Sequence, residues 1–372
     1  MMRMRAWSRS CVAAVTVLLL VTVFPMVDHG AAAQRTAPRR PAAKREVGPA
    51  AAILLDVRTG QVLYARDINR RLPPASTTKI LTAILAIERF PLNTPVIISA
   101  RAAAQRSGAA IGLEAGAQWS IGELLHAMLI RSANDAAVAV AEAYSGSVEA
   151  FADEMNRKAY RIGARNSHFV NPHGLNAPDH YTTAYDLALI ARYALQLPVF
   201  ASLVRQPTWT LDRPDRATHE FSNINKFLAK YEGADGVKTG WTAAAGHCLV
   251  ASATRNGWQL LAVVLHSQEM YRDVTQMLDY GFDTFTPKKL AGRGDPLVTL
   301  NTNLWRSNVV GVVPTDVVAV VRRGTTVSSQ IKLRSDLRPP VAPGAPVGEV
   351  IFFAGQAVVA RSALVAASPK SP

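Results

Sequence analysis

Cysteine is almost absent from this sequence, which contains only Cys11 and Cys248 among 372 residues. Cys11 lies in an apolar run near the N-terminus that we expect to be removed on export. Cys248 would then be the single cysteine of the mature chain, so no intramolecular disulfide can form. A small secreted scaffold held together by disulfides is therefore excluded. The length and the 49% apolar content instead predict a globular protein with a large core and about two domains.

Acidic residues are also scarce: the chain has 27 Asp and Glu residues but 41 Lys and Arg residues, which gives a net charge of +14. The positive charge is spread along the chain, with no lysine-rich block and no alternation of basic and aromatic residues of the kind that follows nucleic acid. We therefore expect a general attraction to anionic surfaces of the cell envelope. No nucleic-acid partner is predicted, and DNA binding is the minor alternative.

The sequence has no apolar run of the ~20 residues that a membrane-spanning helix needs. The run Cys11–Met26 is shorter, follows several arginines and precedes the small residues Ala31–Ala33. This order predicts a secretory signal peptide over residues 1–33, cleaved before Gln34, and hence a protein of the periplasm or extracytoplasmic cell envelope. An uncleaved membrane anchor is the alternative. Residues 34–47 are rich in Arg, Pro and Ala and predict a mobile basic linker.

Residues 48–291 show the pattern of an antiparallel sheet flanked by helices, an α/β (α+β) domain. Strand hairpins at both ends of this region enclose helical patterns, so the first and last strands must meet for one sheet to form. The Asn256-Gly257 turn is the strongest hairpin signal. The expected strands cover 51–56, 61–64, 246–254 and 258–266, and the expected helices cover 80–87, 120–130, 135–144, 148–162, 184–195 and 270–285.

The composition changes at residues 291–296, where Gly and Pro predict a domain boundary. Short Val-rich runs separated by Gly and Pro follow, which indicates a small all-β domain over residues 296–365. Residues 366–372 predict a frayed tail. No amphipathic helix pattern precedes this tail, so membrane association stays an open question.

Ser76 and Lys79 stand where an apolar helical run begins. Residues three apart on a helix share a face, which brings the amine within reach of the hydroxyl proton. Pro73 and Pro74 fit just ahead of a helix, so Ser76 should lie near exposed N–H groups that favour developing negative charge. The pair is typical of a nucleophile and its base, although Ser76 by itself could be a helix cap. A basic Lys79 needs a lowered pKa, through burial or a cationic neighbour such as Lys238.

The same Ser-x-x-Lys pattern recurs at Ser329 and Lys332, in a stretch that predicts a strand. Side chains three apart on a strand point to opposite faces, so we interpret this copy as accidental. Two further clusters support the first copy. They are Ser132-Ala133-Asn134, at a turn between helices, and Lys238-Thr239-Gly240, which enters the late strands.

Together and in this order, the three clusters resemble the Ser-x-x-Lys, Ser-x-Asn and Lys-Thr-Gly motifs that line one cleft in the serine penicillin-recognising enzymes. Asn171–Leu175 and Tyr181–Ala188 extend the resemblance to D-alanyl-D-alanine carboxypeptidases, the low-molecular-mass penicillin-binding proteins. The resemblance implies a β-lactamase/transpeptidase-like fold followed by a small β domain. It also implies removal of the terminal D-alanine from peptidoglycan stem pentapeptides, and acylation by β-lactams.

The resemblance further implies a role for each residue of the clusters. Three would carry acyl and proton transfer: Ser76 as the nucleophile, Lys79 as the proton acceptor and Ser132 as the proton relay. Five would bind substrate: Asn134, Lys238, Thr239, Gly240 and Trp241, the last through a backbone N–H that forms the oxyanion hole with that of Ser76. Arg272 stands where the family has an arginine that assists the terminal carboxylate of the substrate.

Several alternatives share these residues. A class A β-lactamase needs a Glu that activates the deacylating water, and no Glu-x-x-x-Asn pattern occurs. A non-catalytic peptidoglycan- or penicillin-binding protein predicts a degraded motif, and none is degraded. A D,D-endopeptidase differs only in the space beyond the scissile bond. His168 and His180 are too irregularly spaced for a zinc site, and no metal or other cofactor is expected.

Overall fold

The computed structural model describes residues 48–213, 216–300, 309–338 and 340–367. The expected signal peptide and linker (1–47) and residues 368–372 of the expected tail lie outside this part of the chain. Within the described residues no single helix is both long and apolar enough to cross a membrane. Two consecutive helices joined by a sharp bend, at 184–195 and 198–204, meet the length and composition criteria only when taken together.

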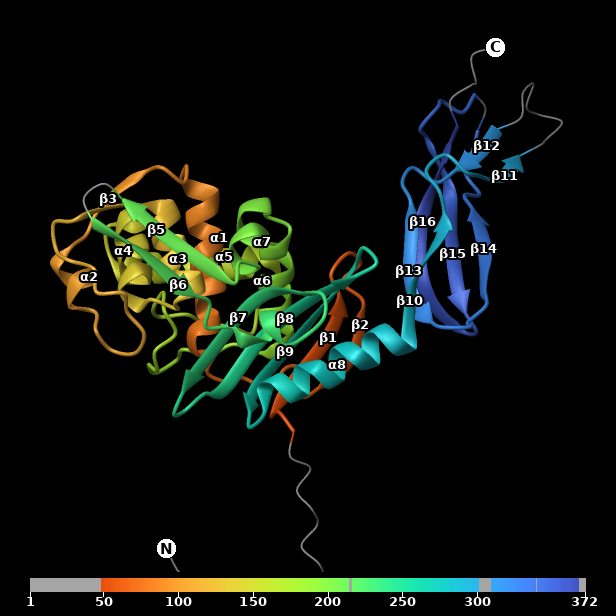
Figure 1. Ribbon diagram of the computed structural model, residues 1–372. Coiled ribbons are helices and arrows are strands. Elements are labelled where there is room, and N and C mark those ends of the chain that lie inside the picture. Colours follow the sequence, from red (N-terminus) through yellow and green to blue (C-terminus); the bar gives the residue numbers. More distant parts are fainter. Residues whose placement is uncertain (1–47, 214–215, 301–308, 339, 368–372) are drawn as a thin grey trace, which may run out of the picture. The chain divides into compact units, whose positions relative to one another are not determined.

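Five antiparallel strands form the sheet that carries the site, in the spatial order β2-β1-β9-β8-β7 (Figure 1). The strands are β1 (Ala51–Asp56), β2 (Val62–Arg66), β7 (Ala234–Thr242), β8 (Gly246–Arg255) and β9 (Trp258–Ser267). β1 pairs with β9 from Ala51, opposite Leu265, to Asp56, opposite Leu260. The first and last parts of the domain therefore meet in one sheet, as predicted, and β7 lies at its edge.

Helices pack on both faces of this sheet, which explains why its central strands are apolar throughout. On β1, Ile53 and Leu55 pack into the core shared with the helical region, whereas Ala52 and Leu54 pack into the core shared with α8 (Met270–Thr284). The alternation follows the two-residue period of a strand. Figure 1 shows α8 lying along one face of the sheet.

The helical region contains α1 (Lys79–Arg89), α3 (Ile121–Ile130), α4 (Asn134–Ser145), α5 (Val148–Ile162), α6 (Ala184–Leu195) and α7 (Pro198–Val204). A capping box begins α3, because the Ser120 side chain accepts from the Glu123 N–H and the Glu123 side chain accepts from the Ser120 N–H. α5 ends at Gly163, whose φ is +99°. Pro198 follows the end of α6 and begins α7, because proline fits the first turn of a helix.

Several short elements were not predicted, because each is too brief or too polar to show a clear period. They are β3 (Pro95–Ile97), α2 (Ala100–Ala104), β4 (Gln118–Ser120), β5 (Thr208–Arg213), β6 (Arg216–Ser222) and the 3₁₀ turns η1 (Ala75–Thr78) and η2 (Lys226–Ala229). η1 is the most consequential of these. It places Ser76 in a tight turn that leads into α1 rather than in the α-helix itself.

The C-terminal part of the described chain consists of strands, which confirms the predicted all-β domain. They are β10 (Phe285–Ala291), β11 (Pro296–Leu300), β12 (Val309–Val312), β13 (Val317–Arg322), β14 (Val327–Leu333), β15 (Pro346–Ala354) and β16 (Ala357–Ala366). Five form a sheet in the order β11-β12-β16-β15-β14, and β10 pairs with β13. By pairing, β10 thus belongs with these strands, although it precedes the expected boundary at 291–296, which stays a prediction.

The second Ser-x-x-Lys pattern lies on β14. Ser329 pairs with Phe352 and Lys332 pairs with Glu349, in the regular register of an antiparallel strand. Residues at i and i+3 of a strand point to opposite faces. The predicted strand is therefore confirmed, and the interpretation of this copy as accidental stays a prediction.

Candidate active site

Ser76 lies in the 3₁₀ turn η1, between Pro74 and the first residue of α1. Two neighbouring hydroxyl groups hold the turn, since Thr77 Oγ1 donates to the Pro74 carbonyl (2.6 Å) and Thr78 Oγ1 donates to the Ala75 carbonyl (2.8 Å). Both threonines are buried, whereas Ser76 is half-buried. The turn therefore fixes the backbone on either side of the serine and leaves its hydroxyl accessible.

Lys79 is fully buried beneath this turn, and its amine has three oxygen neighbours. Nζ lies 2.6 Å from Asn134 Oδ1, 2.7 Å from the His173 carbonyl oxygen and 3.0 Å from Ser76 Oγ. A neutral amine has two N–H donors and one lone pair. The two carbonyl oxygens can only accept, so they take both donors and leave the lone pair for the Ser76 hydroxyl proton.

The surroundings of Lys79 favour the neutral amine. Burial, followed by the nearby Lys238 ammonium, lowers the pKa of Lys79 well below its ordinary value, and Asp135 acts in the opposite direction. Burial also lowers the pKa of Lys238, to about 7. The imidazole of His173 is neutral as well, because burial and Lys79 lower its pKa to about 3. His173 thus contributes its backbone carbonyl, a role that no side-chain motif can reveal.

Ser132 and Asn134 form a second side of the site, where Ser132 lies in the turn between α3 and α4 and Asn134 is the first residue of α4. The φ of Ser132 is +62°, a left-handed conformation that costs a non-glycine residue about 1–3 kcal/mol. This conformation places Ser132 Oγ 3.0 Å from Lys238 Nζ, which donates to it. Both Ser132 and Asn134 are buried. The strained turn therefore connects the Ser132-Ala133-Asn134 cluster to the Lys238-Thr239-Gly240 cluster.

Lys238, Thr239 and Gly240 lie on β7, the edge strand next to η1. Lys238 Nζ also donates to the Thr239 carbonyl (3.0 Å), which fixes the ammonium beside the strand. A Cβ atom on Gly240 would lie 3.0 Å from the Ser76 nitrogen and 3.0 Å from Ala75 Cβ. Any side chain at this position would crowd the serine turn, so glycine favours the close approach of β7.

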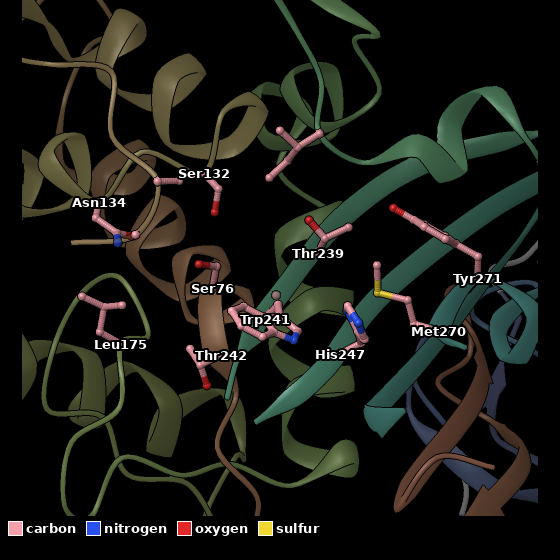
Figure 2. Close-up of a pocket in the computed structure, with 14 residues that line it drawn as sticks. Ser76, Ser132, Asn134, Leu175, Thr239, Trp241, Thr242, His247, Met270 and Tyr271 are labelled. Carbon is pink, nitrogen blue, oxygen red and sulfur yellow. The ribbon is translucent and has the colours of Figure 1, made fainter. Parts of the chain in front are cut away.

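A pocket of about 370 Å³ opens between these elements (Figure 2). It is lined by Ser76, Gly108, Ala109, Ser132, Asn134, Leu175, Ile224, Thr239, Gly240, Trp241, Thr242, His247, Met270 and Tyr271. Figure 2 shows Ser76 between Ser132 and Asn134 on one side and Thr239 and Trp241 of β7 on the other. Leu175, His247 on β8, and Met270 and Tyr271 on α8 also belong to the labelled lining. Lys79 and Lys238 are buried beside the pocket, in contact with Ser76 and Ser132.

The structure thus brings together all but one of the residues selected from the sequence. The exception is Arg272, whose guanidinium pairs with Glu269 (2.7 Å) and whose side chain is 65% exposed. It lines a neighbouring pocket that shares His247, Met270 and Tyr271 with the catalytic pocket. Glu269 is three residues from Arg272, a spacing at which side chains of opposite charge pair locally, and the role of Arg272 at the substrate carboxylate stays a prediction.

Some lining residues were missed by sequence reasoning. Gly108 and Ala109 belong to a loop without a regular pattern, and Leu175 is the last residue of the Asn171–Leu175 segment, to which the sequence assigned no role in the pocket. Within the described residues, no group of three or more His, Cys, Asp or Glu side chains is arranged to hold a metal ion. The chemistry that these groups can perform is acyl transfer to a serine, with a lysine as the base.

The Asn171–Leu175 segment supports the site from below. Its Pro172 carbonyl accepts from Thr82 Oγ1 (2.6 Å), and its His173 carbonyl accepts from Lys79 Nζ. Gly174 has a φ of +90°, and a Cβ atom there would lie 1.8 Å from the Ala75 carbonyl oxygen. No side chain fits in this space.

We expect Gly174→Ala to lower the free energy of unfolding by about 1–3 kcal/mol and to slow acylation, because the serine turn must move. Urea denaturation and the rate of labelling by penicillin measure the two effects. Gly116→Ala is the matched control: its φ is +81°, but nothing lies within 4 Å of the added atom. Equal losses in both variants would show that only backbone strain matters, and not contact with the serine turn.

An antiparallel sheet with helices on both faces, and Ser-x-x-Lys, Ser-x-Asn and Lys-Thr-Gly clusters around one pocket, defines the class of serine penicillin-recognising enzymes. Solved structures support this assignment. Penicillin binding protein 5 from Haemophilus influenzae superposes with a TM-score of 0.77 at 26% identity, over 88% of this chain and 98% of the other.

Sequence comparison narrows the class to a family. The family model for D-alanyl-D-alanine carboxypeptidase matches residues 35–269, and the chain belongs to this family. D-alanyl-D-alanine carboxypeptidase DacF of Bacillus subtilis is 32% identical over 85% of this chain and 84% of the relative. A Pseudomonas aeruginosa protein named D-alanyl-D-alanine endopeptidase is 31% identical over 68% of this chain and 83% of the relative.

Proposed function

We propose that this protein is a serine-type D-Ala-D-Ala carboxypeptidase of the cell envelope, which removes the terminal D-alanine from peptidoglycan stem pentapeptides through an acyl-enzyme on Ser76. The observation that carries the proposal is the environment of Lys79 Nζ. Two carbonyl acceptors occupy its donors, and Ser76 Oγ lies 3.0 Å away on the remaining side. This is the arrangement of a nucleophile with its general base.

In the first step Ser76 Oγ attacks the carbonyl carbon between the two D-alanines and gives its proton to Lys79. Negative charge develops on the carbonyl oxygen, where the backbone N–H groups of Ser76 and Trp241 stabilise it. Gly240 makes this possible, because its lack of a side chain lets β7 approach the Ser76 nitrogen.

In the second step the C–N bond breaks and the leaving amine needs a proton. Ser132 donates its hydroxyl proton to the amine and is reprotonated from Lys238, whose Nζ donates to Ser132 Oγ across 3.0 Å. Thr239 and the positive potential of Lys238 bind the carboxylate of the departing D-alanine, and Asn134 holds the backbone of the acyl portion. The products are free D-alanine and an ester on Ser76.

In the third step water hydrolyses the ester. Ser132 takes a proton from the water and passes one to Lys238, which the second step left neutral. The new C–O bond forms, the ester bond to Ser76 breaks, and Lys79 returns to Ser76 Oγ the proton that it took in the first step, which releases the tetrapeptide and restores both lysines. A β-lactam acylates Ser76 in the same way, except that ring opening leaves no departing group. Covalent inhibition by β-lactams follows from the same geometry. The signal peptide predicted for residues 1–33 supports a place in the envelope, where this substrate occurs.

Incubation of the purified protein with a pentapeptide ending in D-Ala-D-Ala, followed by mass spectrometry of peptide and protein, tests the proposal. We expect release of one D-alanine and one water added per peptide, with only transient acylation of the protein. Stable labelling by penicillin without any release of D-alanine would favour a binding protein and contradict the proposal. Rapid hydrolysis of penicillin without peptide cleavage would indicate a β-lactamase. Cleavage of a cross-linked dimer at the same rate as the pentapeptide would show an endopeptidase.

A further inference from the structure

A loop at residues 105–117, the wall loop, forms one side of the catalytic pocket. It connects α2 to β4 and contributes Gly108 and Ala109 to the pocket lining. Residues 106–110 are exposed, whereas Leu113 is fully buried and anchors the far end of the loop. An exposed loop without regular structure keeps a defined shape only where other groups hold it. The contacts of the wall loop with α4 therefore decide where this side of the pocket stands.

The Asp135 carboxylate supplies most of these contacts. It is completely buried, and its oxygens accept from the backbone N–H groups of Gly112 (2.9 Å), Ile111 (3.1 Å) and Leu113 (3.1 Å). A fourth N–H, that of Ala136, donates to it at 2.9 Å. Backbone donors that face an ionised carboxylate make strong hydrogen bonds and compensate for its burial. Asp135 thus gathers three consecutive amides of the wall loop around one charge.

The wall loop in turn fixes Asn134. The Asn134 N–H donates to the Ala109 carbonyl (2.7 Å), and Asn134 Nδ2 donates to the Ser107 carbonyl (2.7 Å). Because Nδ2 faces the Ser107 carbonyl, Oδ1 faces the opposite way, toward Lys79 Nζ. Gly108 lies against the same amide, since a Cβ atom there would be 2.8 Å from Asn134 Nδ2.

From these contacts we propose that Asp135 is a positioning residue for the acyl transfer proposed above. It holds the wall loop in the place where the Ser107 carbonyl orients the Asn134 amide and thereby the amine of Lys79. Neither the three motifs nor the resemblance assigns it this function. Asp135 does not line the pocket. It acts on the base through three successive contacts: Asp135 with the loop amides, the Ser107 carbonyl with the Asn134 amide, and Asn134 Oδ1 with Lys79 Nζ.

Asp135 also acts on Lys79 by its charge, which provides a readout that a purely structural role would not change. The charged or titratable groups that face Lys79 are Lys238 on β7, Asp135 on α4 and His173 below it. Lys238 lowers the pKa of Lys79 and Asp135 raises it, while His173 is neutral. Removing the Asp135 charge lowers the pKa of Lys79 further. The amine then stays neutral, and basic, to a lower pH.

The test is Asp135→Asn, an isosteric change that keeps the burial but removes the charge and places an N–H group against the loop amides. We expect the second-order rate of acylation by fluorescent penicillin, and kcat/KM for the pentapeptide, to fall about 10- to 100-fold. We also expect the acidic limb of both pH profiles to move to lower pH. An Asp135→Asn protein with the wild-type rate and the wild-type limb would overturn the proposal.

Two further variants complete the experiment. Asp56→Asn is the matched control, because Asp56 is also buried and accepts from the Thr59 N–H in the first hairpin and from Trp258 Nε1 on β9. The pH profile of this variant should match that of the wild type. Gly108→Ala lies on the exposed part of the loop and should fold. It should slow acylation about tenfold, and the acidic limb of its pH profile should not move, because the Asp135 charge remains.

If Asp135→Asn does not fold, wild-type acylation by Gly108→Ala overturns the proposal. Absence of acylation in the wild type itself would contradict the proposed function instead.

Discussion

The Ser76→Ala protein should form no covalent adduct with a fluorescent penicillin and should release D-alanine from a pentapeptide at a rate on the order of 10⁶-fold below the wild type, the scale of losing a serine nucleophile. Ser76 is half-buried in a turn held by Thr77 and Thr78, so removing one oxygen leaves the turn intact. Denaturing gel fluorescence measures the adduct, and coupled detection of D-alanine measures the turnover.

The chain provides its own control for this experiment. Ser329→Ala alters the serine of the second Ser-x-x-Lys pattern, on the exposed strand β14. It should be labelled and turn over as the wild type does. Labelling of the Ser76→Ala protein would contradict the assignment of the nucleophile, and loss of labelling in the Ser329→Ala protein would contradict the interpretation of β14.

Lys79→Met should reduce the rate of acylation by about 10²- to 10⁴-fold, the range for loss of a general base. Methionine is close to lysine in length and apolar, so it fills the buried site but has no lone pair for the Ser76 proton. The pH profile should change as well. In the wild type the rate falls as the pH drops through the lowered pKa of Lys79, because the protonated amine cannot accept a proton. In the variant this limb should be absent.

Stopped-flow acylation across a pH series measures both effects of Lys79→Met. Lys332→Met is the control, since Lys332 has the same place in the second pattern but lies exposed on β14. An acidic limb that persists unchanged in the Lys79→Met protein would assign the titration to another group. Lys238 is the candidate in that event, because its pKa is also lowered.

Lys79 and Lys238 show how much of the site can be predicted from the sequence. A base with a lowered pKa was required by the chemistry, and Lys238 was the expected cationic neighbour. The structure adds the order of the causes, with burial ahead of Lys238 and Asp135 opposing both. Burial depends on every element that surrounds a side chain, so it cannot be read from a three-residue motif.

Arg272 is a prediction that rests on the resemblance alone. Its guanidinium forms an exposed ion pair with Glu269, three residues earlier. It lines a pocket that shares His247, Met270 and Tyr271 with the catalytic pocket. A role for Arg272 at the substrate carboxylate therefore stays a prediction.

The sequence by itself predicted which residues would carry the chemistry and determined most of the elements that present them. Periodicity, caps and turns are local signals, so the hairpins, α5, α6 and the closure of β1 onto β9 followed from them. Ser76 and Lys79 form a pair by spacing alone, and the strand pattern around Ser329 excluded the second copy.

Only the tertiary structure decided how Lys79 is held. Two of its three partners are oxygens that no motif marks: the His173 backbone carbonyl and an Asn134 amide oriented by the Ser107 carbonyl. Every residue has the same backbone carbonyl, so the position of this group depends on the fold of the chain and not on the identity of the residue. For this reason the sequence predicted the nucleophile and its base, whereas only the fold showed that the lone pair of Lys79 Nζ faces Ser76.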